Sequence, residues 1–303
     1  MSMHFRAVAQ QAAADGKIDA EEVLQLRRAA WPDGVIDAEE ADAILSINDL
    51  VSNKGPEWTD FLTEAVCEYM LRADEPRGYV SPAKAAWLIA ALDRDGQLDS
   101  MTELELLVRV IEKADGTPEE LKAYALRQIE RAVVFGSGPT RDSGALHAGS
   151  ITEAECALLR RLIFASGGDG PARVSKAEAE MLFRIKDAAL GALGAPEWER
   201  LFVQGVGNAV QGWRAVEGLT HERAAELESF MNDTNSRVGS FLSRMARFEA
   251  VRAAKAPRNP FAEAKSDAAL TQPEQDWLDG LIGADDEIDP LERALLTFLG
   301  EVS

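Results

Sequence analysis

The sequence predicts an all-α protein made of two tandem copies of one compact multi-helix unit, joined by short capped turns. Three observations lead to this fold class: apolar residues recur at spacings of three and four, alternating strand-like runs are almost absent, and one helix-junction phrase returns along the chain. In residues 102–114 the apolar positions at helical spacing are Leu104, Leu106, Leu107, Val110 and Ile111. Short helices therefore account for the pattern.

The junction phrase is a glycine, one further residue, an aliphatic residue and then Asp, Ser or Thr, often with an acid three residues later. At the first junction, Gly16 can take the left-handed conformation that ends a helix, and Ile18 can pack on the core before the next helix begins. Asp19 is the expected N-cap, and Glu22 closes a capping box. Residues 34–40 repeat the phrase.

The same order returns further along the chain, so the sequence predicts a compact bundle of short helices with tight turns. Proline at position 82 suits the first turn of a helix that begins after Ser81. The expected N-caps after the first are Asp37, Ser81, Asp99, Thr152, Ser175 and Asp289.

When the chain is laid over itself, the same landmarks occur twice in the same order. Trp58 in "GPEWTDFLTEAV" corresponds to Trp198 in "APEWERLFVQGV", and Trp87 corresponds to Trp277. We expect these recurring tryptophans in the core. Further on, the sequence match pairs the caps Asp99 and Asp289.

The duplication divides the chain into a first unit over residues 1–116 and a second over residues 117–303. The offset between matched tryptophans rises from 140 to 190 along the second copy. This jump predicts a helical insertion in the second unit, at about residues 212–270.

The predicted insertion has a charge unlike the rest of the chain, because residues 237–258 hold six basic residues and one acid, beside an apolar stripe at helical spacing. Two interpretations stay open. The insertion either packs its stripe on the body and pairs its cations with an acidic surface, or projects to bind an acidic protein, a membrane surface or another copy of the chain. The candidate partner-binding residues are Arg237, Arg244, Arg247, Phe248, Arg252 and Lys255.

The junction phrases also look like half of a calcium-binding EF-hand loop, which needs oxygen ligands at positions 1, 3 and 5 and a Glu at position 12. With Gly16 at position 6, Asp15 and Glu22 fit, but Gln11 and Ala13 occupy positions 1 and 3. We therefore expect degenerate turns and no cofactor, with a weak divalent-cation site, such as one for calcium, left open. The candidate ligands are Asp15, Glu22, Asp33, Glu40, Asp93, Asp95, Asp285 and Glu292.

Short helices, Asp-Gly turns and a glutamate after the cap together resemble the tellurite-resistance TerB-like family. The resemblance implies an all-helical fold, divalent-cation binding by acidic turn residues and a role in bacterial responses to tellurite and other chemical stress, often in assemblies near the membrane. The residues that carry it are Asp15, Gly16, Glu22, Asp33, Gly34, Glu40, Asp95, Gly96 and Asp99, with Asp285, Asp289 and Glu292 as a degenerate copy.

Charge and motifs argue against nucleic-acid binding and catalysis. With 52 acidic and 32 basic residues the formal net charge is -20, which repels phosphate backbones. The three histidines, His4, His147 and His221, lack the spacing of a zinc site, and no P-loop follows a strand. Cys67 and Cys156 stand in apolar helical patterns, so buried reduced thiols are expected.

No apolar run approaches the ~20 residues of a membrane helix, and the N-terminal residues lack the apolar core of a signal peptide, so we expect a cytoplasmic protein. The sequence favours a non-catalytic helical protein that acts by binding another protein or by self-association. The alternative is a divalent-cation binder or sensor. A metal-dependent hydrolase is disfavoured because His and Cys clusters are missing.

Overall fold

The structure is a computed structural model that describes residues 16–30, 35–93, 98, 100–141, 148–165, 173–191, 194–212, 272–283 and 288–300. This part of the chain contains eleven α-helices, so the predicted all-α class is confirmed. Its only strands, β1 (Lys17–Ile18) and β2 (Asn53–Lys54), form one short parallel pair. None of the described helices is long and apolar enough to cross a membrane.

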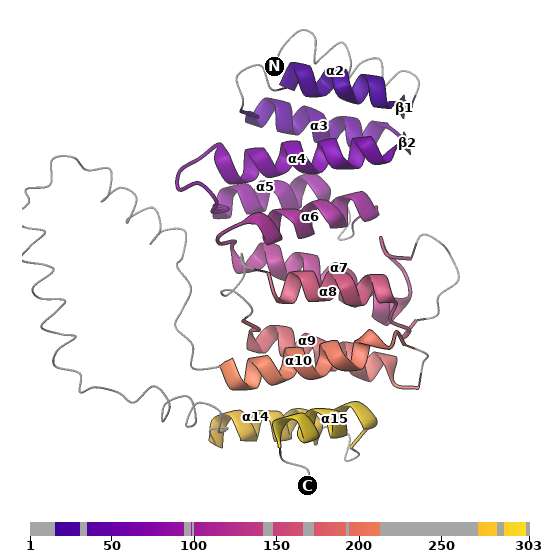
Figure 1. Ribbon diagram of the computed structural model, residues 1–303, viewed down its shortest axis with the longest axis vertical. Coiled ribbons are helices and arrows are strands. Elements are labelled where there is room, and N and C mark those ends of the chain that lie inside the picture. Colours follow the sequence, from indigo (N-terminus) through magenta and orange to yellow (C-terminus); the bar gives the residue numbers. More distant parts are fainter. Residues whose placement is uncertain are drawn as a thin grey trace, which may run out of the picture.

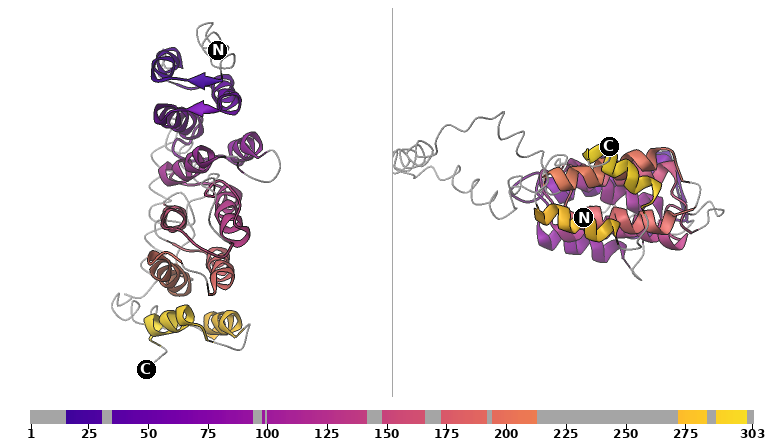
Figure 2. Two further views of the ribbon diagram at one scale, coloured as in Figure 1. Left: turned by 90° about the vertical axis from the view of Figure 1, so that its right-hand side faces the viewer. Right: turned by 90° about the horizontal axis from the view of Figure 1, so that it is seen from below.

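The helices stack in chain order into an elongated body, with α2 at one end and α14 and α15 at the other (Figure 1). Most helix axes lie across the long axis of the stack, as the turned views show (Figure 2). In chain order the helices are α2 (Ala20–Ala30), α3 (Ala38–Leu50), α4 (Pro56–Arg72), α5 (Pro82–Leu92), α6 (Met101–Lys113), α7 (Glu119–Phe135), α8 (Glu153–Ile163), α9 (Lys176–Ala189), α10 (Glu197–Gly212), α14 (Gln272–Ile282) and α15 (Pro290–Leu299).

Two long helices organise the packing. Helix α4 contacts α2, α3 and α6, and α10 makes the corresponding contacts with α8, α9 and α15. Between these groups, α7 and α8 pack on α6, while α7 also contacts α5 and α9. Buried aliphatic and aromatic side chains form one continuous core through these contacts.

Local capping explains where most helices begin. A side-chain oxygen of the cap accepts a hydrogen bond from the backbone N–H three residues later, as expected, at Asp19, Asp37, Ser81, Thr152, Ser175 and Asp289. The preceding aliphatic residue is buried at Ile18, Ile36, Val80, Ile151 and Val174. Gly16 has the positive φ, 70°, that the sequence predicts at the first junction, and the helix expected before it lies outside the described residues.

The expected cap at Asp99 is wrong. Ser100 caps α6 and forms a capping box with Glu103. Eight residues separate α5 from α6, whereas seven separate α14 from α15, so the cap Asp289 corresponds to Ser100 rather than to Asp99. A one-residue difference in loop length therefore shifted the sequence match.

Ile288 is also an exception, since it stands before a cap but is 52% exposed. The aliphatic residue in the turn before α6, Leu98, is buried, and its backbone N–H donates to Gln128 Oε1 on α7 with an N to O distance of 3.4 Å. Helix α15 is the last described helix, so no following helix covers the turn at Ile288.

Matched tryptophans make matched hydrogen bonds. Trp87 Nε1–H donates to Asp42 Oδ1 at 2.8 Å, and Trp277 Nε1–H donates to Glu180 Oε1 at 3.1 Å. Both rings are only partly buried, so the expected core position is wrong for this pair. Their polar edges reach an acid near the start of α3 or α9 instead.

A second matched pair links α3 to α6 and α9 to α15. Asn48 Nδ2–H donates to Glu103 Oε1 at 3.1 Å, and Lys186 Nζ–H donates to Glu292 Oε1 at 2.8 Å. Each bond joins the last turns of one helix to the buried glutamate at the start of another. The donor differs, but the connection between elements is the same.

The outer face of α15 is more polar than the matching face of α6. Leu104 and Val108 are fully buried on α6, which packs on α4 as well as on α7 and α8. The corresponding residues of α15, Arg293 and Thr297, are exposed. Polar residues thus close the C-terminal end of the described stack, as in terminal repeats of solenoid proteins.

We predict that Trp58→Phe destabilises the fold more than Trp198→Phe, by roughly 1 kcal/mol in the free energy of unfolding. Both indoles are buried, but Trp58 Nε1–H donates to Asn48 Oδ1 at 3.1 Å. Trp198 Nε1 has no partner in the described part of the chain, where a lysine at position 186 offers no acceptor. Urea denaturation of both variants measures the difference, and equal losses would contradict the assignment.

Candidate functional site

Four of the eight predicted metal ligands lie in the described part of the chain, and the structure does not gather them. Glu22 is on α2 and Glu292 on α15, at opposite ends of the stack (Figure 1). Glu40 is on α3, and Asp93 follows the last turn of α5. The other predicted ligands, Asp15, Asp33, Asp95 and Asp285, lie outside the described residues.

The three glutamates use a carboxylate oxygen to cap a helix. Glu22 Oε2 accepts the Asp19 N–H at 3.0 Å, as the capping interpretation predicts. Glu40 Oε2 and Glu292 Oε2 accept the N–H of their own cap residues at 3.2 and 3.0 Å. Among the described residues there is no group of three or more His, Cys, Asp or Glu that could hold a metal ion. Metal binding through the remaining acids stays a prediction.

The predicted partner-binding residues of the insertion lie outside the described residues, which leave out the whole of 213–271. These residues are Arg237, Arg244, Arg247, Phe248, Arg252 and Lys255. The histidines His4, His147 and His221 also lie outside.

Sequence reasoning missed a set of buried cations that hold the helices together. Lys84, Lys122, Arg141 and Lys186 are all buried in the described core. A buried charge is tolerated only when it is paired and hydrogen-bonded. For the three lysines the only sequence signal was a basic residue at an apolar position of a helical pattern, which does not identify its partner, and Arg141 lies between helices without such a signal.

Lys186 is the most buried of these cations, with 1% of its side chain exposed. Its Nζ lies 2.7 Å from Asp187 Oδ1, 2.6 Å from Asp289 Oδ2 and 2.8 Å from Glu292 Oε1. Burial alone would lower the pKa of Lys186, but hydrogen bonds to the three carboxylates outweigh it and raise the pKa above the usual value. The ammonium therefore stays charged and ties α9 to α15.

Arg141 is the buried cation at the start of α8, where it binds Ser150 and Glu155. Its Nη2 donates to Glu155 Oε2 at 3.0 Å and to the Ser150 carbonyl at 2.5 Å. Thr140 donates its hydroxyl to Glu155 Oε1 at 2.6 Å. Glu155, which is fully buried, also closes the capping box with Thr152. This cluster is structural and leaves no carboxylate oxygen for a ligand.

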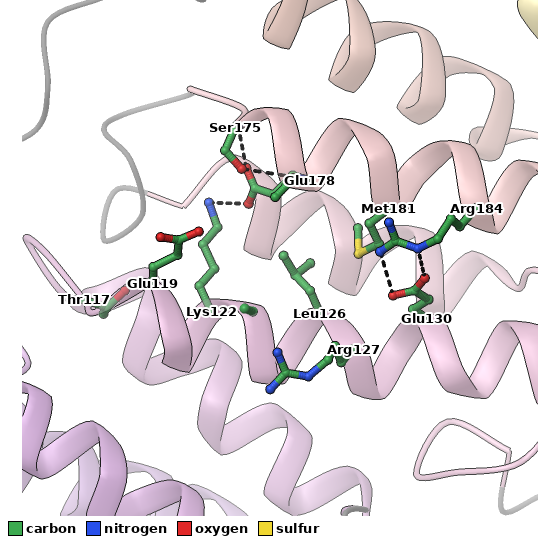
Figure 3. A pocket seen from close by; sticks show the side chains of 12 residues that line it. Thr117, Glu119, Lys122, Leu126, Arg127, Glu130, Ser175, Glu178, Met181 and Arg184 are labelled. Carbon is green, nitrogen blue, oxygen red and sulfur yellow. Dashed lines mark hydrogen bonds and ion pairs between the residues drawn. The ribbon is translucent and has the colours of Figure 1, made fainter. Parts of the chain in front are cut away.

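A cleft of about 220 Å³ lies between α7 and α9 (Figure 3). At one end, Lys122 Nζ lies 2.6 Å from Glu178 Oε1 and 3.5 Å from the Ile163 carbonyl oxygen at the end of α8. At the other end, Arg184 Nε lies 2.6 Å from Glu130 Oε1. Each ion pair therefore joins the same two helices across the cleft.

The cleft has an apolar floor between these ion pairs. Leu126 of α7 and Met181 of α9 lie between the two pairs, and each side chain is 4% exposed (Figure 3). The small residues Ala123 and Ala177 leave space above them. Arg127 lies on the rim, with its guanidinium 5.9 Å from the centre of the Tyr124 ring.

The first half of the chain lacks these side chains at the matching positions of α3. Ala43 corresponds to Met181, and Ser46 corresponds to Arg184. The matching positions of α3 therefore lack the methionine and the arginine that line the cleft. The cleft was missed because it depends on how α7 packs on α9.

The cleft is smaller than most cofactor sites, and its described lining lacks histidine and cysteine, which commonly bind metals or act as nucleophiles. Typical small-molecule sites enclose about 300–1,000 Å³. Among the described residues that line the cleft, none is His or Cys. Lys122 and Arg184 are paired with Glu178 and Glu130, and the lining also includes Glu119 and Arg127. The apolar floor between the two ion pairs fits an inserted apolar side chain.

The two cysteines are free and buried, as the sequence predicts. Burial raises the pKa of the Cys67 thiol to about 11 and that of Cys156 to about 12. Both thiols are therefore protonated near neutral pH and are poor nucleophiles. They lie on α4 and α8 and are not among the residues that line the cleft.

No protein-family model matches the chain, and comparisons with curated proteins and with solved structures likewise find no match.

We predict that Lys122→Met lowers the free energy of unfolding by about 3–5 kcal/mol, because it leaves the Glu178 carboxylate buried without its cation. Arg184→Met, at the other end of the same cleft, is the matched control. It should cost about 0–1 kcal/mol, because Arg184 is 55% exposed. Urea denaturation measures both changes. Similar small losses for both variants would show that the Lys122 pair does not hold α7 to α9.

Proposed function

We propose that this chain is a non-catalytic protein that binds another protein through the cleft between α7 and α9. The observation that carries the proposal is an apolar floor, Leu126 and Met181, which lines the cleft between two ion pairs. The occupant is a partner segment that inserts a large apolar side chain. Flexible methionine side chains adapt well to such an insertion.

Charge supports a protein partner over a polyanion. The chain carries a formal net charge of -20, so nucleic acid and anionic lipid are repelled at long range. Close to the cleft the charges balance: Lys122 faces Glu178, Arg184 faces Glu130, and Arg127 and Glu119 complete the charged lining. A partner segment that places an acid near Arg127, beside its apolar anchor, would meet a complementary charge.

The proposal includes a tandem arrangement of units over residues 1–116 and 117–303. Its support is the matched bonds of Trp87 and Trp277 and the matched links at Asn48 and Lys186. A cytoplasmic location is part of the proposal, supported by two free thiols. A role in a bacterial stress response rests on the resemblance to the TerB-like family alone.

Divalent-cation binding is the alternative, and it has less support. The carboxylates of Glu22, Glu40 and Glu292 already accept backbone hydrogen bonds, and Glu292 is paired with Lys186. A cation would have to compete with these bonds or rely on Asp15, Asp33, Asp95 and Asp285.

The test is selection from a random linear-peptide library against the full chain. We predict that the enriched peptides share a large apolar residue and that Ala177→Trp, which fills the cleft, weakens their binding at least tenfold. A tenfold change corresponds to about 1.4 kcal/mol of lost contact energy. Ala90→Trp on the exposed face of α5 is the matched control and should bind normally.

Enriched peptides that bind Ala177→Trp as well as the wild type would contradict the cleft as the binding site. If no peptide is enriched and calcium titration by calorimetry gives heat, the alternative function is favoured.

A further inference from the structure

Helix α8 is clamped to α6 by a single arginine. Arg161 Nη1 donates to Glu105 Oε2 at 2.6 Å, and Nε donates to Glu112 Oε1 at 2.8 Å. Its Nη2 donates to both carboxylates, at 2.9 Å to Glu105 Oε1 and 2.7 Å to Glu112 Oε2. The two glutamates are seven residues apart, so they lie on the same face of α6. One guanidinium thus recognises an acidic helix.

The charges in this clamp stabilise one another. Burial would raise the pKa of Glu105, but the hydrogen bonds from Arg161 outweigh it and lower the pKa below its usual value. Bidentate bonds between guanidinium and carboxylate are about twice as strong as neutral hydrogen bonds. The clamp therefore stabilises the packing of α8 on α6 and also helps to fix the angle between these helices.

Helix α2 has an arginine, Arg28, at the position that corresponds to Arg161, as the contacts of the preceding residue in each helix show. Arg27 Nη1 lies 2.5 Å from Glu64 Oε2 on α4, and Arg160 Nη1 donates to Gln204 Oε1 on α10 at 3.1 Å. These matched contacts show which residue of α2 corresponds to which residue of α8. The next residue along is Arg28 in α2 and Arg161 in α8.

Arg28 has no described helix to clamp. Helix α2 is the first described helix and lies at the end of the stack (Figure 1). Arg28 is exposed, and none of the hydrogen bonds or ion pairs of the described part involves it. Leu24, one turn earlier on the same face, is 45% exposed. The result is an apolar side chain beside an unused guanidinium.

We propose that the outer face of α2, formed by Leu24 and Arg28, binds an acidic amphipathic helix of a partner protein. The partner helix carries two carboxylates seven residues apart, which Arg28 clamps as Arg161 clamps α6. Leu24 covers apolar side chains between those carboxylates. This surface lies on another helix than the cleft between α7 and α9, so the inference stands independently of the proposed function.

A second copy of the chain is a poor partner for this face. The C-terminal end of the stack offers Ala294 where α6 has Glu105, and it exposes Arg293, which would repel Arg28. Two α2 faces in contact would also place like charges together. A membrane surface is disfavoured by the net charge of -20. An acidic helix of another protein satisfies both the charge and the apolar side chain.

The probe for the test is a synthetic peptide of residues 101–113 of this chain, with blocked ends and a fluorescent label. A hydrocarbon bridge replaces the side chains of Glu103 and Leu107, on the face opposite Glu105 and Glu112. The bridge keeps the short peptide helical. It also removes the Glu103 carboxylate, which binds Asn48 in the native position of α6, so the peptide cannot substitute for α6.

Binding to the full chain is measured by fluorescence anisotropy. We expect Arg28→Ala to weaken binding at least tenfold and a peptide with Glu105→Gln and Glu112→Gln to lose binding to the same extent. Arg293→Ala, which removes an exposed arginine from the other end of the stack, is the matched control and should bind normally. Because Arg28 is exposed without a described partner, Arg28→Ala should unfold at the same urea concentration as the wild type.

Two results would overturn the proposal. The first is no saturable binding of the bridged peptide to the wild-type chain. The second is binding that Arg28→Ala leaves unchanged, including binding lost only in Arg161→Ala, which would place the peptide at the native α6 site.

Discussion

A buried glutamate three residues after the N-cap uses its two carboxylate oxygens for different tasks, and the stack depends on this division. In Glu103, Glu178 and Glu292, Oε2 accepts the N–H of the cap residue and so fixes where the helix begins. The Oε1 atoms of the same residues contact Asn48, Lys122 and Lys186, each on another helix. The residue that starts a helix therefore also selects the helix it packs against. Because a buried carboxylate without its partner is costly, local and tertiary structure are stabilised together.

This arrangement recurs at Glu103, Glu178 and Glu292, and the two surfaces proposed for partner binding lie where the side chains at matching positions differ. Within the second half, Met181 and Arg184 replace the Ala43 and Ser46 of the first half, and the cleft forms there. At the C-terminal end, polar side chains close the stack. At the other end, α2 retains an arginine that the equivalent α8 uses to hold α6. A stack with a small cleft between α7 and α9 and an exposed arginine on α2 suits the proposed binding role.

Much of the fold could be predicted because capping is local: a cap, its glutamate and the preceding aliphatic residue stand within a few positions of one another. The partner of the second oxygen of each glutamate could not be predicted, because that partner lies far along the chain, as with Lys186 and Glu292. The exposure of residues at the end of the stack could not be predicted either. Ile288 is exposed although its sequence pattern matches that of buried residues elsewhere. The cleft and the α2 face escaped sequence reasoning because both depend on which helices are neighbours.

The most direct test of the coupling between cap and packing is hydrogen exchange at the Ser175 amide, whose N–H donates to Glu178 Oε2. Lys122→Met removes the cation from Glu178 Oε1, and Lys122 Nζ contacts this carboxylate and the Ile163 carbonyl but not the cap Ser175. Arg127→Met, at an exposed position on the same helix as Lys122, is the control. Our account predicts at least tenfold faster exchange at Ser175 in Lys122→Met, equal to about 1.4 kcal/mol of lost protection, and no change in the control. Unchanged exchange in Lys122→Met would show that capping and packing are independent.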